Sequence, residues 1–142
     1  MERDCLFCRI ASGEAAAHIV HRDDRCVAFL DHAPIREGHV QIIPVAHFES
    51  FELLPAADAH AILDLGQRIA QAQKALFGVP RVGFLFTGGD IDHVHAHLVP
   101  LVEKTDITST AYIRTPQLQF GAAPHADADA LRTTADRLRA AL

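Results

Sequence analysis

The sequence contains fewer basic than acidic residues, and this argues against polyanionic partners. It contains 13 lysines and arginines against 18 aspartates and glutamates, a formal net charge of −5 over 142 residues. The basic residues are scattered along the chain. A protein that grips a nucleic-acid backbone or an acidic membrane surface needs a basic patch. We therefore expect neither a nucleic-acid polymer nor a membrane among its partners.

Long apolar runs are also absent from the sequence. None approaches the roughly 20 residues that a membrane-spanning helix needs. The opening stretch, MERDCLFC, lacks the basic-then-apolar pattern of a secretory signal peptide. These absences favour a cytoplasmic protein. The hydrophobic content of 49% in 142 residues predicts one compact domain with a single core.

Cysteine is scarce, and the odd count of three argues against a disulfide framework. Two of the cysteines form the pattern Cys5-x-x-Cys8. Two thiolates at this spacing can hold two corners of a tetrahedral zinc whose other ligands come from elsewhere. The alternative is a pair of ordinary buried or surface thiols. Cys26, in the strand-like run RCVAFL, is expected to be a small buried apolar residue.

The apolar pattern predicts an α+β fold in which an antiparallel sheet packs with one long central helix. Three short strand-like runs separated by turn signals are typical of a meander. Two later runs flank the turn-forming TGGDID and predict a hairpin that extends the sheet. Apolar residues at three-to-four spacing predict the helices. The expected elements are strands 18–22, 26–31 and 39–44, a helix 55–77, strands 81–86 and 93–102, and a carboxyl-terminal helix 127–142.

The run HVHAHLVP places histidines at alternate positions. On a strand, His93, His95 and His97 share one face, because side chains alternate between faces. With a rise of about 3.3 Å per residue, the Cα atoms of His93 and His97 lie about 13 Å apart. That is too far for all three to bind one ion. The three histidines must therefore divide their roles.

A division becomes possible once the cysteines are counted. His93 and another histidine such as His47 could complete a zinc shell with the two thiolates. The middle imidazole, His95, would then be free to attack a phosphorus or acyl centre. His97 could donate a hydrogen bond to the charge on the transferred group. A bond from one ring nitrogen of His95 to a backbone carbonyl would leave the other lone pair facing the substrate.

The segments CLFCRIASGE, RDDRCVAFLDHAPIREGHVQIIPVAH, LLPAAD and HVHAHLVP, in this order and spacing, resemble the histidine triad (HIT) family over about Cys5 to Leu101. The resemblance implies an α+β fold, a two-fold homodimer, and a purine nucleotide site on each subunit. Members transfer or hydrolyse nucleotidyl groups. Their substrates are nucleoside phosphoramidates in the Hint-like branch, which the Cys-x-x-Cys pattern resembles, and dinucleoside polyphosphates in the Fhit-like branch.

The resemblance also implies roles for particular residues. His95 takes up the nucleoside monophosphate, and His97 contacts the phosphate. Asp31 accepts hydrogen bonds from the ribose hydroxyls, and His39 lies near the active-site strand. A structural zinc is implied and no organic cofactor. The implied zinc ligands are Cys5, Cys8, His47 and His93. The implied base-pocket residues are Phe7, Ile10 and Phe29. We expect residues 1–104 to form the nucleotide-binding domain and residues 105–142 an extension packed on it.

One departure from the family pattern leaves the leaving group open. Many members carry Gln and then Ser or Thr shortly before the first histidine, where this chain has Gly89 and Asp90. A carboxylate there would repel a polyphosphate unless it turns away. Backbone N–H groups of Gly88 and Gly89 could approach the phosphate, or the glycines could serve a turn that needs positive φ.

Two other functions remain open from the sequence. The departure at Gly89 and Asp90 favours a purine-nucleotide-binding sensor or interaction module with negligible turnover. A hydrolase with a catalytic metal ion held by the histidines is disfavoured by the strand geometry. The preference between adenosine and guanosine is also open. In related proteins the carboxyl-terminal segment can border the partner subunit's site, which makes Tyr112 and Phe120 candidates.

Overall fold

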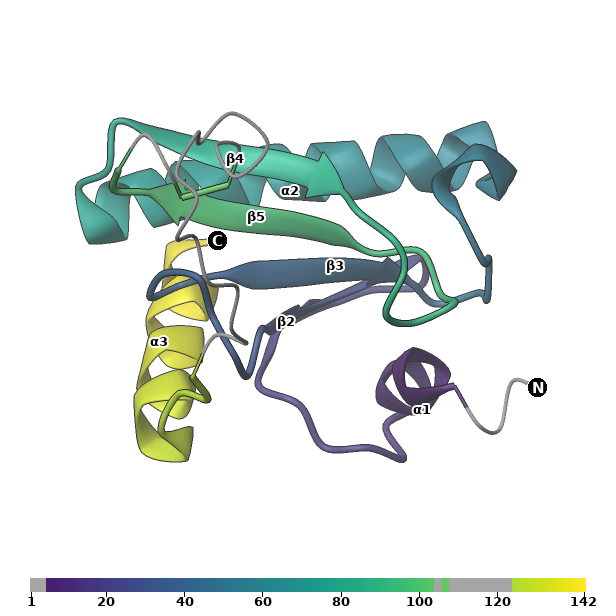
Figure 1. The fold of residues 1–142 in the computed structure, drawn as a ribbon, viewed down its shortest axis with the longest axis horizontal. Coiled ribbons are helices and arrows are strands. Elements are labelled where there is room, and N and C mark those ends of the chain that lie inside the picture. Colours follow the sequence, from purple (N-terminus) through teal and green to yellow (C-terminus); the bar gives the residue numbers. More distant parts are fainter. Residues whose placement is uncertain (1–4, 104–105, 108–123) are drawn as a thin grey trace, which may run out of the picture.

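The computed structural model describes residues 5–103, 106–107 and 124–142 (Figure 1). Tyr112 and Phe120 lie outside these residues. The described elements, in chain order, are α1 (Leu6–Ser12), β1 (Ile19–Arg22), β2 (Cys26–Leu30), β3 (Val40–Pro44), the short 3-10 helix η2 (Phe51–Leu53), α2 (Ala56–Phe77), β4 (Arg81–Phe86), β5 (Ala96–Leu101) and α3 (Ala128–Ala141). No helix among them is both long and apolar enough to cross a membrane.

The sheet has five strands in the order β1-β2-β3-β5-β4, and every neighbouring pair is antiparallel. The predicted meander and the predicted hairpin are both confirmed, and with them the α+β fold. The register aligns Phe29 with Gln41 and Gln41 with His97. Because directly opposed residues point to the same face, these three side chains share one face of the sheet. This face carries the candidate site.

The two faces of the sheet are covered differently. Helices α2 and α3 pack on one face, over a core that includes Ala28, Ile42 and Leu98. Helix α1 packs on the other face, where Phe7 and Ile10 meet Phe29 and Ile43. In Figure 1, α1 and α3 lie toward opposite ends of β3. The short α1 leaves part of its face uncovered, and a cavity opens there.

The long helix α2 follows its predicted boundaries. Pro55 is its N-cap, and Gly78, with a φ of 64°, ends it in the left-handed conformation that glycine adopts at little cost. Its buried side chains include Ile62, Leu65 and Ile69. These recur at three-to-four spacing, which is the pattern of one helix face resting on a sheet.

Two features differ from the predicted elements. Helix α1 was not predicted, although Phe7, Ile10 and Ala11 have helical spacing and Gly13 ends the helix with a φ of 84°. The last strand was predicted to begin at His93, and this is wrong, because β5 begins at Ala96. Pro44, at the end of the neighbouring β3, has no N–H to donate to the ladder. The N–H of Val94 instead bonds to the carbonyl of Phe48, at 2.7 Å.

The carboxyl-terminal helix packs against α2, β1 and β2. Its N-cap Asp127 accepts a bond from the N–H of Ala130, and Leu131, Ala135 and Leu138 are buried in the core beneath it. Ahead of the helix, the N–H of Ala126 bonds to the carbonyl of His32 at 2.9 Å. The helix is thereby fixed beside the end of β2. The division of the chain at residue 104 stays a prediction.

Candidate functional site

A cavity of about 760 Å³ opens on the face of the sheet that carries α1. Its volume is in the usual range for small-molecule sites. One wall is apolar and comes from α1 and β2, and the floor is polar and comes from β3 and the histidine run. The residues that line the cavity include Phe7, Ile10, Phe29, Asp31, Gln41, Asp90, His95 and His97.

The three predicted base-pocket residues lie together in the apolar wall. Phe7 packs edge-on against Phe29 with ring centroids 5.5 Å apart, and Ile10 is buried next to them. Phe7 also contacts the ring of His95, at 5.2 Å between centroids. The same residues form the core beneath α1, so this packing supports both the fold and a flat apolar surface beside the imidazole.

The tautomer of neutral His95 is determined by a carbonyl two residues before it. Its Nδ1 lies 2.8 Å from the carbonyl oxygen of His93. A carbonyl can only accept, so Nδ1 carries the proton of the neutral ring and Nε2 keeps its lone pair. No described group bonds to Nε2, and the residue lines the cavity at 6% exposure. In the neutral ring, this geometry presents the lone pair of Nε2 to a ligand.

His97 is part of a chain of hydrogen bonds that fixes its tautomer too. The N–H of Ile35 donates to Nδ1 of His39 at 3.2 Å. Nε2 of neutral His39 therefore carries its proton and donates to Nδ1 of His97 at 2.9 Å. Nε2 of His97 must then be the protonated nitrogen, and it donates to the hydroxyl of Thr87 at 3.1 Å. His97 thus directs an N–H donor away from His39.

Burial keeps this pair of histidines neutral. It lowers the pKa of His39, which is 3% exposed, below its usual value. Burial, followed by the neighbouring His39 and His95, lowers the pKa of His97 to about 4. At neutral pH the N–H of His97 is therefore a donor without a positive charge. His39 was predicted to lie near the active-site strand, and the structure places it one hydrogen bond from His97.

Asp31 follows β2 directly and is held as a carboxylate. Burial raises its pKa, but hydrogen bonds from the N–H of Ala33 and from Gln41 bring it below the usual value. The Ala33 bond is 2.9 Å long and the Gln41 bond 2.7 Å. Each carboxylate oxygen retains a further lone pair, so the group can also accept from a ligand.

Gln41 and Thr87 are site residues that the sequence reasoning missed. Gln41 is the one polar residue of β3, VQIIP, and that interruption of an apolar run was its signal. Its Oε1 is buried without a hydrogen-bond partner in the described structure, while its amide nitrogen is committed to Asp31. Thr87 gave no comparable signal, because its contact with His97 depends on how the β4–β5 loop folds.

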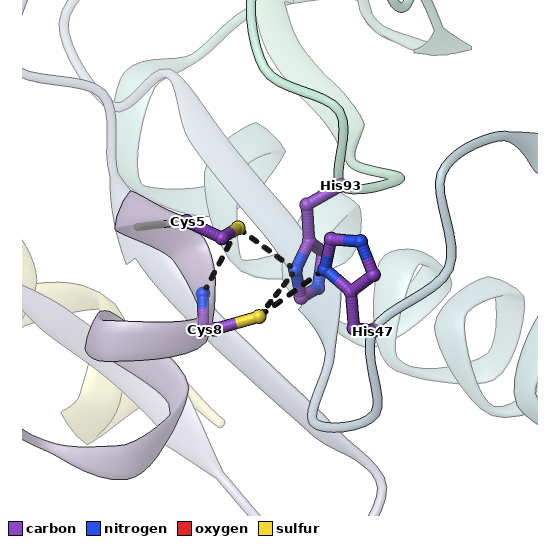
Figure 2. A group of neighbouring side chains, drawn as sticks. All are labelled: Cys5, Cys8, His47 and His93. Atoms are coloured by element: carbon purple, nitrogen blue, oxygen red, sulfur yellow. Dashed lines mark hydrogen bonds between the residues drawn. The ribbon is translucent and has the colours of Figure 1, made fainter. Parts of the chain in front are cut away.

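The four predicted zinc ligands come together from three parts of the chain (Figure 2). Cys5 caps α1 and Cys8 lies in its first turn, so one short helix positions both sulfurs. His47 follows β3, and His93 precedes β5. Their ligand atoms all lie within 4.8 Å of one another. Separations between sulfur and Nδ1 are 3.5 Å for Cys5–His93, 3.4 Å for Cys8–His93 and 3.2 Å for Cys8–His47.

These separations fit a tetrahedral zinc. Bonds of about 2.3 Å to sulfur and about 2.0 Å to nitrogen at tetrahedral angles put the two atoms about 3.5 Å apart. Nε2 of His93 donates to the carbonyl of Pro44 at 3.0 Å, which leaves the Nδ1 lone pair facing the sulfurs. Burial also lowers the pKa of His93 and favours the neutral, ligating form.

A second group, Asp31, His39 and His97, also has its ligand atoms within 4.8 Å. Here the hydrogen bonds argue against a metal. Because His39 accepts at Nδ1 from a backbone N–H, its Nε2 holds a proton and has no lone pair to give. These side chains form a hydrogen-bonded chain, and the donor set that suits zinc is the cysteine–histidine group.

The loop between β4 and β5 brings Asp90 and Ile91 into the cavity wall, but not the two glycines. Gly88 and Gly89 have φ values of 96° and 114°, so the turn uses the backbone freedom of glycine. The predicted phosphate contact of Gly89 stays a prediction. Asp90 is near enough to His97 for its charge to act against the lowering of that residue's pKa.

Comparison with known proteins places the chain in a family. An uncharacterised HIT-like protein of Saccharolobus solfataricus is 32% identical over 68% of this chain and 73% of its own length. Adenylylsulfatase HINT3 of Arabidopsis thaliana is 28% identical over 84% of this chain and 64% of its own length.

Solved structures share the fold. A HIT-like protein from Bartonella henselae superposes with a TM-score of 0.80 at 21% identity, covering 99% of this chain and 97% of that one. A zinc-bound histidine triad family protein from Mycobacterium smegmatis has a TM-score of 0.76 at 26% identity, covering 99% and 94%. The HIT domain family itself matches residues 12–104, including the whole histidine run. The chain therefore belongs to the HIT domain family.

Proposed function

We propose that this protein is a cytoplasmic nucleotidyl hydrolase or transferase that cleaves purine nucleotide derivatives at the α-phosphate and releases a nucleoside monophosphate. The observation that carries the proposal is the tautomer of His95, whose unprotonated Nε2 lies in a cavity wall beside a neutral N–H donor, His97. The relative HINT3, named an adenylylsulfatase, supports chemistry at an adenylyl group.

The cavity suits a nucleoside 5′-phosphate bound in one orientation. A purine fits against the apolar wall of Phe7, Ile10 and Phe29. Ribose hydroxyls can donate to Asp31, which has acceptor capacity left after its bonds to Ala33 and Gln41. This arrangement directs the 5′-phosphate toward His95 and His97 at the other side of the polar floor.

The reaction takes two displacements. The Nε2 lone pair of His95 forms a bond to the α-phosphorus while the bond to the leaving group breaks, and the leaving group keeps that electron pair. An amine leaving group then takes a proton from solvent. Water next attacks the same phosphorus, the phosphorus–nitrogen bond breaks, and His95 regains its lone pair as water loses a proton to solvent. Splitting one hard displacement in this way is the advantage of a covalent intermediate.

His97 contributes through its protonated Nε2. In the free protein this N–H donates to Thr87, and in the complex it would donate to a phosphate oxygen. Stabilising charge on the transferred group with a fixed donor is usually the largest catalytic contribution. A donor without a net charge also avoids holding the product monophosphate too tightly. The backbone N–H of Gly89 is a second proposed donor to the phosphate.

The zinc is proposed to be structural. Cys5, Cys8, His47 and His93 would hold it, and its chemistry there would be to cross-link α1 to the residues before β5. His93 would then be fixed at both ring nitrogens, by the metal and by the carbonyl of Pro44. Because the carbonyl of His93 itself orients His95, a rigid His93 also keeps the nucleophile in place.

A homodimer is proposed through α2 and β4. Strand β4 is an edge of the sheet as described, and an unpaired edge is normally protected. Large apolar side chains are exposed around it, with Phe84 at 37%, Leu63 at 48% and Phe51 at 54%. A second copy of the chain placed over this surface would cover them. Sedimentation velocity with Leu63→Glu, which should shift the protein to a monomer, tests this arrangement.

A non-catalytic nucleotide sensor is the second candidate, and the observation that favours it is the unpaired Asp90 carboxylate beside the histidines. The two functions are separated by AMP release from an adenosine phosphoramidate and from diadenosine tetraphosphate. We expect release by the wild type, none by His95→Ala, and full activity in His60→Ala, an exposed histidine of α2. Equal AMP affinity in wild type and His95→Ala, with turnover in neither, would support the sensor.

A further inference from the structure

The acidic and basic side chains of the cavity wall, apart from its histidines, are all of one sign. Among the described residues that line it, Asp31 and Asp90 are the carboxylates, and there is no lysine or arginine. Asp31 is already engaged by Ala33 and Gln41. Asp90, in contrast, forms no hydrogen bond or ion pair with any described residue and is exposed toward solvent. The wall therefore carries an uncompensated negative charge on the side of His97.

The hydrogen-bonded histidines next to the charge, His97 and His39, do not cancel it. The pKa of His97 is lowered to about 4 and that of His39 lies below its usual value, so both are neutral at neutral pH. His95 must be unprotonated at Nε2 to attack. A ligand phosphate beside His97 therefore meets neutral N–H donors and a nearby carboxylate, with no lysine or arginine in the described lining to balance several negative charges.

The position of Asp90 assigns it to the leaving group. Asp31 lies at the end of β2, and Asp90 lies in the β4–β5 loop three residues before His93. With the base against α1 and the α-phosphorus at His95, the ribose occupies the Asp31 side. The group attached to the α-phosphorus then leaves past His97, where the charge of Asp90 acts.

We propose that Asp90 selects substrates by the charge of the leaving group, favouring α-phosphate derivatives whose leaving group carries an amine or ammonium and disfavouring polyphosphates. This inference rests on the proposed function. A phosphoramidate carries one negative charge at the cleaved phosphate, and an ammonium on its leaving chain is attracted to the carboxylate. A dinucleoside polyphosphate brings several more negative charges toward it, and each one is repelled.

The selected step is cleavage of the phosphorus–nitrogen bond. The bridging nitrogen first takes up a proton from solvent and carries a positive charge. The bond from Nε2 of His95 to phosphorus then forms as the neutral amine departs with the bonding electrons, and the released amine takes up a second proton from solvent to become an ammonium. Asp90 stabilises the positive charge of this protonated nitrogen without itself exchanging a proton. A polyphosphate leaving group develops negative charge at the same place, which the carboxylate destabilises. The discrimination therefore acts in the transition state as well as in binding.

The test compares two adenosine 5′-phosphoramidates of equal chain length, one from 1-aminopentane and one from 1,4-diaminobutane, whose free end is an ammonium. Diadenosine tetraphosphate is the third substrate. The proteins are wild type, Asp90→Asn, Asp90→Ser and the matched control Asp92→Asn, which removes an exposed carboxylate that does not line the cavity. The quantity measured is kcat/KM for AMP release.

We expect Asp90→Asn to lower the ratio of kcat/KM for the ammonium-ended phosphoramidate to kcat/KM for the neutral-ended one about tenfold. The same variant should raise kcat/KM for the tetraphosphate, relative to the neutral-ended phosphoramidate, by at least as much. Asp90→Ser should behave alike, and Asp92→Asn should change both ratios less than threefold. The wild-type preference should shrink from 20 mM to 500 mM salt, because exposed charges are screened.

Unchanged ratios in both Asp90 variants, with AMP still released, would overturn the charge selection and leave the proposed function standing. No AMP release by the wild type from any of the three substrates would overturn the proposed function and the selection with it. The Asp90 carboxylate bonds to no described group, so its substitution should leave the melting temperature near that of the wild type.

Discussion

Replacing His39 with Leu tests how the tautomer of His97 is set. His39 is 3% exposed and bonds on both sides, accepting from the N–H of Ile35 and donating to Nδ1 of His97. Ile35 is 45% exposed, so water can replace its partner. The buried Nδ1 of His97 loses its donor, which costs about 1–3 kcal/mol. At this chain length we expect a fall of roughly 3–9 °C in melting temperature.

The larger effect should be on activity. Without the His39 donor, His97 is free to hold its proton on Nδ1, and its Nε2 then no longer offers an N–H to the phosphate. Losing one such donor typically costs about 10²–10³-fold in kcat. Long-range ¹H–¹⁵N NMR of ¹⁵N-histidine-labelled protein reports the tautomer directly, and AMP release reports kcat.

A matched substitution distinguishes the hydrogen-bonding role of His39 from its contribution to packing. His39→Gln places an amide nitrogen near the position of the imidazole Nε2, where it can still donate to His97, so it should recover part of the lost kcat. The exposed His60→Leu serves as the control for loss of a histidine. A His39→Leu protein whose His97 keeps its proton on Nε2, or whose kcat matches the wild type, would refute the reasoning.

Three further outcomes follow from the structure. Cys8→Ala should abolish the zinc seen by native mass spectrometry and lower the melting temperature, whereas wild type purified without near-stoichiometric zinc would contradict a structural metal. Gly38→Ala should cost about 2–4 kcal/mol in urea unfolding, because its φ is +85° and an added Cβ would meet the Phe77 ring, while Gly13→Ala, with φ +84° and open space, should cost only about 1–2 kcal/mol. The free energy of unfolding of the wild type should fall as pH drops from about 6.5 to about 4, because His97 binds a proton in the unfolded chain at a pH where the folded protein, with a pKa of about 4 for this residue, does not. A His97→Gln protein whose stability falls equally steeply with pH would contradict this.

The fold was predictable where a residue pattern determines the element by itself. The spacing of Ile62, Leu65 and Ile69 defines α2, and Gly78 ends it. The start of β5 was not predictable, because the alternation of the histidine run looks the same inside a strand and before one. The difference is made by Pro44 on the neighbouring strand, which cannot donate to the ladder. Pairing of this kind depends on long-range register.

Helix α1 was missed for a different reason. Seven residues are too few for helical periodicity to stand out, and an isolated helix of that length is unstable in water. Its stability comes from burying Phe7 and Ile10 against the sheet and from Arg22, which bonds to the carbonyls of Ile10 and Ala11 at its end. Both contributions exist only once β1 and β2 have formed. The helix is nevertheless what brings Cys5, Cys8 and Phe7 to the site.

The residue types at the site were therefore easier to predict than their hydrogen bonds, and the hydrogen bonds decide what each histidine can do. A neutral imidazole has one donor and one acceptor, so fixing one nitrogen fixes the other. In this chain the carbonyl of Pro44 turns His93 toward the cysteines, and the carbonyl of His93 turns the lone pair of His95 toward the cavity.

The tautomer of the third histidine, His97, is determined from further away, since the N–H of Ile35 acts on it through His39. Three identical side chains on alternate residues thus receive three different hydrogen-bonding arrangements from backbone groups on separate segments. It follows that a change which leaves every histidine in place but shifts the β3–β5 pairing would move the Pro44 carbonyl and with it the orientation of His93. The proposed nucleophile next to it, His95, would then be misdirected, although none of the proposed zinc ligands or catalytic residues had been replaced.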